Sequence, residues 1–274
     1  ELGTVASSIS AIGGELRSAI ASNIASLRTV GSKMLVDFKG TRYTDLARSA
    51  VEIVDRNLYE RSCDVRWWAT DSSVIEVLER PTSASIAHAT DRLATILRSY
   101  TVYLDLWVAD ATGRIVATGR PDRYPHALGL DVSAERWFRE AMATQSGEEF
   151  RVCDIAANAT LGNAQVATYS TAVRAGGTTR GTAMGALGIF FDWAPQAQGV
   201  LDGIGLSPAE RATSRLMLLD ASHRVIASSD GQGLCSELYP LDTGRRDSGY
   251  YQRDGKLVAF GSEAGDCGVI DISA

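Results

Sequence analysis

The sequence predicts an α+β protein in which a long N-terminal helix is followed by two tandem modules, each an antiparallel sheet with flanking helices. Two observations predict this class. Apolar residues recur every three or four positions through the first hundred residues, and one hairpin pattern occurs twice, as VADATGRIVAT at 108–118 and LLDASHRVIAS at 218–228. In both copies an Asp-Ala-Thr/Ser corner, whose side chains can bond their own backbone, joins two apolar strands. A supersecondary unit that occurs twice indicates two related modules.

The composition excludes several classes of protein. The chain has 274 residues, of which 45% are hydrophobic and 22% charged, as is typical of a soluble globular protein with room for two domains. Its net charge of −6 leaves no basic surface for nucleic acid. No apolar run approaches the roughly 20 residues of a membrane helix, and the chain begins without Met or a signal peptide. We therefore expect an excised segment whose flanking transmembrane helices lie outside it.

The helical part is expected to cover residues 1–100. From Glu1 to Phe38 the apolar residues recur in steps of three, four and seven, which predicts one amphipathic helix with a narrow apolar stripe. The stripe either covers the core of its own chain or pairs with a second copy in a homodimer. Gly40 is predicted to break or kink the helix before its periodicity resumes towards Trp67 and Trp68.

The first sheet module is expected over residues 101–196. The period becomes strand-like at the first hairpin, and a loop follows at 120–130. A short helix is predicted from Asp131 or Ser133, and three further strands are predicted at 149–155, 165–173 and 183–191. Five strands with one helix between them suggest a sheet with one face covered and the other open to a pocket.

The second module, residues 197–274, repeats this plan in less space. After a glycine-rich connector it contains five short strand candidates, at 216–219, 224–228, 249–253, 256–261 and 269–272. Fewer residues separate its hairpin from its end, which leaves less room for a loop that encloses a ligand. The first module is therefore the better candidate for binding.

Several segments in order resemble a known family. These are the long helix, the DATGRIVAT hairpin, the helix start DVSAERWF, the strands ATYSTAV and GALGIFFDW, and the compact second hairpin module. Together they resemble a double Cache (dCache) domain, with two PAS-like modules, over nearly the whole chain. Such domains are extracytoplasmic ligand sensors of bacterial chemoreceptors, histidine kinases and cyclic-dinucleotide enzymes. The resemblance implies a periplasmic location and a small-molecule pocket in the first, membrane-distal module.

The resemblance also bears on the ligand. Amino-acid-binding members hold the ligand carboxylate with an Arg two residues before an aromatic pair, and the ammonium with acidic residues on later strands. In this chain the first position is Glu135, with Arg136 one place along the helix, and the acidic positions correspond to Asp154 and Phe190. The loss of the guanidinium and of one acid disfavours a standard α-amino acid.

The candidate ligand-binding residues are aromatic or charged and lie in the first module: Trp107, Arg120, His126, Arg136, Trp137, Phe138, Asp154 and Tyr169. An aromatic pocket with carboxylates at Asp154 and at Glu135 or Asp105 suits an amine, through cation–π contact and charge pairing. If Arg120, Arg136 and His126 point inward, the pocket suits an organic acid instead. The alternative is that Trp137 and Phe138 only seat their helix on the sheet and that His126 is solvated.

The four cysteines show no C-x-x-C spacing, so neither a zinc site nor a redox motif is indicated. In an oxidising periplasm two bridges are expected, Cys235–Cys267 within the second module and Cys63–Cys153 between the helical region and the first module. The alternative for the second pair is two buried free thiols.

No sequence motif indicates an enzyme or a cofactor. The chain lacks G-x-S-x-G, H-E-x-x-H, the P-loop and the dinucleotide-binding fingerprint, and it contains three His residues. We expect a non-catalytic sensor domain. The alternative function is a structural or partner-binding ectodomain whose pocket is filled by its own side chains.

Overall fold

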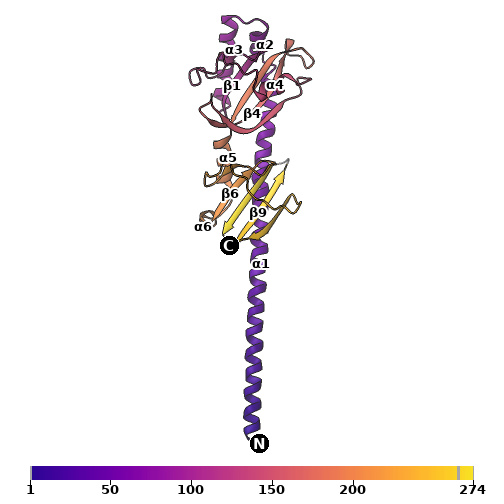
Figure 1. Ribbon diagram of the computed structural model, residues 1–274, viewed down its shortest axis with the longest axis vertical. Helices are drawn as coiled ribbons and strands as arrows, with labels where there is room; N and C mark the ends of the chain where they lie inside the picture. Colours follow the sequence, from indigo (N-terminus) through magenta and orange to yellow (C-terminus); the bar gives the residue numbers. More distant parts are fainter. Residues whose placement is uncertain (1, 264–265, 274) are drawn as a thin grey trace.

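The computed structural model describes residues 2–263 and 266–273, and within them the side chains of residues 12–263 and 268–272. Helix α1 runs without interruption from Leu2 to Trp68. It passes alongside both sheets, and its N-terminal part extends beyond them (Figure 1). At 1.5 Å per residue its length is roughly 100 Å. Within the described residues, no helix carries an apolar stretch long enough to span a membrane.

The expected break at Gly40 is wrong, because this glycine lies inside α1. A Cβ atom at Gly40 would come within 2.4 Å of the ring of Tyr250. The Tyr250 hydroxyl also donates a hydrogen bond of 2.9 Å to Asp37 Oδ1, one turn earlier in the helix. Glycine is therefore used here for close approach of a ring to the helix backbone, and not to end the helix.

The first sheet has the strand order β2-β1-β5-β4-β3, with all pairs antiparallel. Helices α2 (Ser72–Glu79) and α3 (Ser83–Ser99) and the end of α1 cover one face, and α4 (Arg136–Met142) lies against the other. A 3₁₀ turn, η1 (Ala175–Gly177), joins the last two strands. The strands are β1 (Tyr103–Asp110), β2 (Ile115–Thr118), β3 (Arg151–Asn158), β4 (Ala164–Arg174) and β5 (Ala183–Asp192).

Helix α4 begins later than its sequence predicts. The backbone of Asp131 forms an isolated antiparallel β-bridge with that of Arg114. The Asp131 carboxylate accepts a hydrogen bond of 2.9 Å from the backbone N–H of Ser133. Such an Asx turn offers the backbone an alternative to helix, so the chain turns here and becomes helical only after Glu135.

The second sheet repeats the topology of the first, with the order β7-β6-β10-β9-β8. Two short helices, α5 (Trp193–Gly203) and α6 (Pro208–Ala212), connect the sheets. The predicted two-sheet α+β fold is thus confirmed. The strands are β6 (Ser214–Leu219), β7 (Val225–Ser228), β8 (Ser248–Arg253), β9 (Lys256–Glu263) and β10 (Asp266–Ser273).

The repeated hairpin is the same in both modules down to its register. Trp107 pairs with Thr118 in the first copy, and Met217 pairs with Ser228 in the second, at the equivalent positions. Both copies shift register one residue before the turn. At the corner, Asp110 accepts hydrogen bonds from the backbone N–H groups of residues 112 and 114, and its counterpart accepts them from residues 222 and 224.

One large hydrophobic core extends through the whole molecule. It fills the space between α1 and both sheets and includes residues from α2, α3 and α5. Trp193, at the start of α5, is buried, and its indole Nε1–H donates a hydrogen bond of 2.6 Å to the carbonyl of Ile226 in the second sheet. Smaller cores lie on the opposite face of each sheet. Of the adjacent tryptophans, Trp68 is buried in the large core, whereas Trp67 is 69% exposed.

Candidate functional site

A cavity of about 830 Å³ opens beside α4, on the face of the first sheet that α1 does not cover. Strands β1, β3 and β4 and helix α4 form most of its wall, and the turn between β6 and β7 of the second module forms one side. Its charged lining residues are Glu135, Arg136, Asp154, Asp220 and Arg224, and its larger apolar ones are Trp107, Leu130, Val132, Trp137, Ile155, Val166 and Leu238.

Two residues that line the cavity, Trp107 and Trp137, belong to an aromatic cluster with Phe190. The ring of Trp107 lies 4.1 Å from that of Phe190, and the ring of Trp137 lies 6.0 Å from Phe190 in an edge-to-face arrangement. All three side chains are at least 95% buried. A Cβ atom at Gly188 would come within 2.9 Å of the Trp137 ring, so this glycine lets the ring lie against the sheet. Trp137 therefore seats α4 against the sheet, and Trp107 and Trp137 also line the cavity.

Asp105 fixes the position of Trp107. This fully buried carboxylate accepts hydrogen bonds from the indole Nε1–H of Trp107 at 2.9 Å and from the backbone N–H groups of Leu106, Gly119 and Arg120 at 2.8 to 3.0 Å. Burial raises the pKa of Asp105 to about 6, although these four donors oppose the shift. The carboxylate therefore holds both the cavity's tryptophan and the start of the 120–130 loop, and it is not available to a ligand.

A pair of opposite charges crosses the rim from α4 to β3. Arg136 Nε lies 2.7 Å from Glu140 Oε1, and Arg136 Nη1 lies 3.5 Å from Asp154 Oδ2. The side chain of Arg136 is 59% exposed and that of Asp154 is 78% exposed. Because two carboxylates share one guanidinium in contact with water, the Asp154 carboxylate keeps oxygen lone pairs for another partner.

The second module closes the other side of the cavity. Arg224 Nε lies 2.8 Å from Asp220 Oδ2, and Arg224 Nη2 donates a hydrogen bond of 3.4 Å to the carbonyl of Ile155 in β3. One guanidinium thus joins the repeated turn of the second module to the edge strand of the first.

The structure brings four of the expected ligand-binding residues together. Trp107, Arg136, Trp137 and Asp154 all line the cavity. They come from β1, α4 and β3.

The other four expected residues do not line it. Tyr169 lies on the opposite face of the sheet, in the core beneath α1, where it stacks on Phe150 with ring centres 6.3 Å apart. Phe138 is buried beneath α4. His126 is exposed on the 120–130 loop, and Arg120 contributes its backbone N–H to Asp105.

The lining residues that sequence reasoning missed include two groups that carry most of the additional polar side chains. Asn158, Thr160 and Thr168 lie on β3, on β4 or in the turn between them, and Asp220, Ser222, Arg224 and Leu238 come from the second module. The sequence does not show which face of β3 and β4 lines a cavity, so the first group could not be selected. The second group carried no signal, because Asp220 and Ser222 were interpreted as turn residues alone.

The expected disulfide between Cys63 and Cys153 is wrong, since both thiols are free. Cys63 is exposed on α1, whereas Cys153 packs against the core on the other side of the sheet, so the sheet separates them. Cys235 is also free and lies against the first module, with its Sγ 3.8 Å from the carbonyl of Ile155. The Cys235–Cys267 bridge is therefore absent at Cys235, and the side chain of Cys267 lies outside the described residues. Across the described residues, no three His, Cys, Asp or Glu side chains gather as a metal site would require.

Comparisons with known proteins find relatives at the level of structure. No protein-family model matches the sequence, and no curated protein matches it. The sensor domain of the V. cholerae histidine kinase DctB is 12% identical, with a TM-score of 0.65 over 88% of this chain and 98% of that one. The ligand-binding domain of the Campylobacter jejuni chemoreceptor Tlp3, solved with L-valine, is 17% identical, with a TM-score of 0.62 over 84% of this chain and 91% of that one.

The ligand-binding domain of the Pseudomonas fluorescens chemoreceptor CtaA, solved with L-serine, is 16% identical, with a TM-score of 0.57 over 88% of this chain and 98% of that one. The chain therefore has the fold of the sensor domains of histidine kinases and chemoreceptors. The resemblance to double Cache domains is confirmed at the level of the fold.

Proposed function

We propose that the chain is the periplasmic ligand-sensing domain of a transmembrane chemoreceptor or sensor kinase, and that it binds a small polar molecule in the cavity beside α4. The observation that carries the proposal is the cavity itself. Its volume of about 830 Å³ lies within the range of small-molecule sites, roughly 300 to 1,000 Å³. It combines aromatic surface with a few charged groups, which is the usual composition of such sites, and the fold is shared with domains that bind small ligands.

The charges favour an amine over an organic acid. Three carboxylates line the cavity, at Glu135, Asp154 and Asp220, against two guanidinium groups. Both guanidinium groups already pair with carboxylates, Arg136 with Glu140 and Arg224 with Asp220. A ligand carboxylate would have to displace one of these pairs, whereas an ammonium group can add to the largely exposed carboxylate of Asp154, whose contact with Arg136 is long, at 3.5 Å. The same pairing leaves no free guanidinium for a standard α-amino acid.

A thermal-shift screen of the purified chain against amines, organic acids, amino acids and purines tests the function. An amine is expected to raise the melting temperature, because a ligand at a hundred times its Kd stabilises the folded state by about 2.7 kcal/mol. Failure of every compound class to shift the transition would support the second candidate, a structural or partner-binding ectodomain. The near-complete burial of Trp107, Trp137 and Phe190 is the observation that favours this candidate.

Replacing Asp154 with Ala is expected to weaken binding of the amine found in that screen by about tenfold, equivalent to roughly 1.4 kcal/mol. The side chain is largely exposed, so the fold should keep its stability. Isothermal titration calorimetry measures the affinity, and the control is Asp91→Ala, which removes an exposed carboxylate from α3, on the face of the first sheet opposite the cavity. Unchanged affinity in Asp154→Ala would remove this residue from the site.

We further propose that the signal passes from the cavity to α1. Closure of the 120–130 loop and α4 over a ligand would move the first sheet against α5. The bond between Trp193 and Ile226 ties the start of α5 to the second sheet, and α1 contacts both sheets. The bias on the output is limited by the difference in ligand affinity between the two states.

A homodimer through α1 is the second part of this proposal. An apolar stripe on the free part of α1 faces solvent, and its members are 45% to 71% exposed: Ile12, Leu16, Ile20, Ile24, Leu27, Val30, Met34, Leu35 and Phe38. Helices with such a stripe bury it by pairing. A second copy supplies an identical stripe.

In sedimentation equilibrium, the weight-average mass of the chain is expected to rise with concentration towards that of two chains. The double variant Ile20→Lys/Leu27→Lys should remain a single chain at the same concentrations. Ser22→Lys/Thr29→Lys places the same charges on the opposite side of the helix and should behave as the wild type. Equal masses for the two double variants would rule out this stripe as the contact.

A further inference from the structure

The cavity is not confined to the module that the fold assigns to binding. Asp220, Ser222 and Arg224, from the β6–β7 turn, and Leu238, from the loop after β7, line it together with α4 and β3 of the first module. We infer that the second module completes the ligand site, so that a bound molecule lies between the two modules and contacts both. This inference rests on the proposed sensing function.

Three contacts set the spacing between the modules at this point. Arg224 Nη2 donates to the carbonyl of Ile155, and the same carbonyl lies 3.8 Å from Cys235 Sγ. Gln165 Nε2, at the start of β4, lies 3.4 Å from the same sulfur. The turn and the loop of the second module therefore touch the edge of the first sheet directly beside the cavity, and the wall that they form is part of the folded structure.

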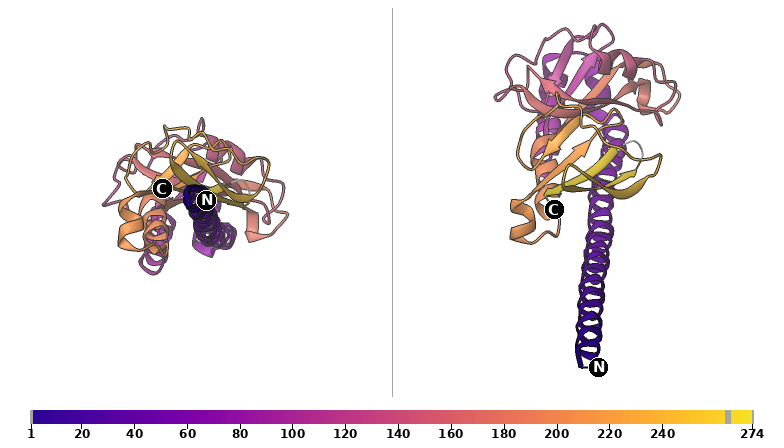
Figure 2. Two further views of the ribbon diagram at one scale, coloured as in Figure 1. Left: turned by 90° about the horizontal axis from the view of Figure 1, so that it is seen from below. Right: turned by 60° about the horizontal axis from the view of Figure 1, so that its bottom comes forward.

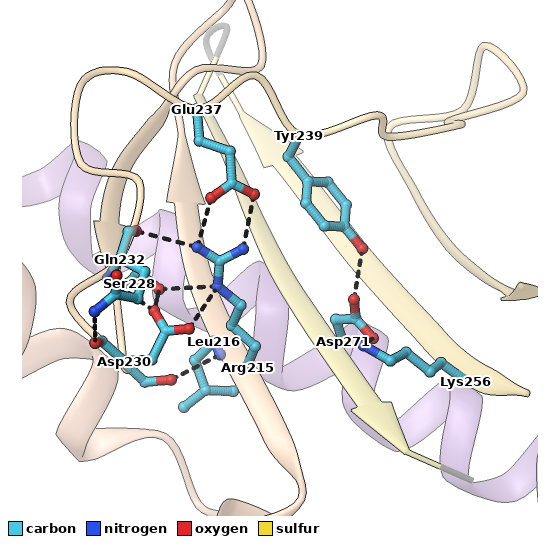
Figure 3. A network of polar contacts seen from close by, with 10 residues as sticks. Arg215, Leu216, Ser228, Asp230, Gln232, Glu237, Tyr239, Lys256 and Asp271 are labelled. Carbon is cyan, nitrogen blue, oxygen red and sulfur yellow. Dashed lines mark hydrogen bonds and ion pairs between the residues drawn. The ribbon is translucent and has the colours of Figure 1, made fainter. Parts of the chain in front are cut away.

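The two neighbours of Leu238 in the sequence, Glu237 and Tyr239, hold this loop in place (Figure 3). Arg215 of β6 binds both carboxylate oxygens of Glu237, at 2.7 and 2.8 Å, and also lies 3.0 Å from Asp230 Oδ2. Two residues further on, the Tyr239 hydroxyl donates a hydrogen bond of 2.9 Å to Asp271 of β10, the last strand. A bidentate pair fixes geometry as well as charge, so the wall is ordered before any ligand arrives.

The arrangement assigns a role to the acid of the repeated turn. The counterpart of Asp220 in the first hairpin, Asp110, organises its turn in the same way but does not line the cavity. Asp220 organises its turn with Oδ1 and pairs with Arg224 through Oδ2 at the cavity wall. A cationic ligand held by Asp154 on one side would therefore meet a second carboxylate across the module boundary, and ligand occupancy would depend on the spacing of the modules.

Cys153 provides a native reporter that needs no ligand. Its partly buried side chain lines the cavity, where burial raises the pKa of its thiol while Arg136 opposes the shift. In a background with the other three cysteines replaced by Ser, we would measure the rates at which Cys153 reacts with a cationic reagent, trimethylammonioethyl methanethiosulfonate, and with its anionic sulfonatoethyl analogue. Each reaction forms a mixed disulfide and releases methanesulfinate. The ratio of the two rates reports the local charge, because a change in thiol pKa affects both equally.

Asp220→Asn keeps the turn's acceptor and removes the charge, and it is expected to lower the ratio of cationic to anionic labelling by about threefold. Asp254→Asn removes one charge from the distant β8–β9 turn and should leave the ratio unchanged. If Asp220→Asn does not fold, Leu238→Glu adds a charge to the same wall and should raise the ratio. If the labelling ratio is the same in the wild type, in Asp220→Asn and in Leu238→Glu, the inference is overturned.

An amine from the thermal-shift screen provides the second arm. Its affinity is expected to fall at least fivefold in Asp220→Asn. If it binds this variant as it binds the wild type while Asp154→Ala weakens it, the ligand contacts the first module alone and the inference fails, although the sensing function stands. If no compound binds but the labelling ratio responds to the wall variants, the shared cavity stands and the sensing function fails.

Discussion

Replacing Asp105 with Ala is expected to lower the free energy of unfolding by about 3 kcal/mol at pH 7 and to release the indole of Trp107. The carboxylate accepts four hydrogen bonds at a position with no solvent exposure. Each buried donor left without a partner costs about 1 to 3 kcal/mol, and the removal of a buried charge offsets part of the total. Gly119 N–H retains a bond to the carbonyl of Leu106, so its share of the loss is smaller.

The cost of this substitution should increase as the pH falls. Burial raises the pKa of Asp105 to about 6 in the folded protein, and the unfolded value is about 3.9. The folded state thus binds the proton more tightly. The group's contribution to stability is fully present below the unfolded pKa and is lost as the pH rises through about 6. The difference between wild type and Asp105→Ala is expected to grow by about 2 kcal/mol between pH 7 and pH 4.

Denaturant unfolding at several pH values measures this difference, and the indole ¹H–¹⁵N resonance of Trp107 should shift as Asp105 titrates. The control is Asp110→Ala, which removes a carboxylate that also accepts hydrogen bonds but lies in a partly exposed turn; we expect a loss of about 1 kcal/mol that does not grow towards acid. A pH-independent difference for Asp105→Ala would show that its carboxyl titrates normally.

Replacing Gly268 with Ala is expected to destabilise the protein by about 3 kcal/mol, by forcing α1 away from the second sheet. A Cβ atom on Gly268 would come within 2.6 Å of the carbonyl oxygen of Ala47, which is helix backbone and cannot rotate aside. Gly261 on the adjacent strand meets the backbone of Arg48 at 2.8 Å in the same way. An added group in such close packing costs about 1 to 3 kcal/mol or more.

Gly199→Ala is the matched control, since Gly199 lies within α5 with no heavy atom within 4 Å of the added methyl group. Helix propensity predicts that this variant is more stable by up to about 1 kcal/mol. Chemical unfolding of both variants makes the comparison. Similar free energies of unfolding for the two variants would mean that α1 and β10 can move apart with little loss of stability.

Most of the fold could be predicted from the sequence, because the patterns that indicate it are local and one of them occurs twice. The periodic apolar residues predicted α1, and the two Asp-Ala-Thr/Ser corners predicted hairpins that share one register. Gly40 failed as a helix breaker, since its partner Tyr250 is distant in the sequence and close approach leaves no local pattern.

The site was harder to predict for a different reason. Nearly every residue of β4 is buried, because the sheet is covered on both faces, so no polar alternation showed which side Tyr169 takes. The contributions of Asp220 and Arg224 depend on how the two modules dock, and no spacing within either module encodes this. The free Cys63 and Cys153 make the same point, because an even number of cysteines says nothing about which side of a sheet each one occupies.

The large core that runs along α1 affects whether the two copies of the repeated unit can be separated. Although the chain contains one unit twice, the two copies share their largest core: the helix that covers the first sheet also covers the second, and residues of α5 join the same core. Figure 2 shows α1 running beside both sheets, and a cut between the copies would expose apolar residues of the shared core on both halves. We therefore expect the two copies to unfold together in one cooperative transition, and neither half to stay folded when it is produced alone.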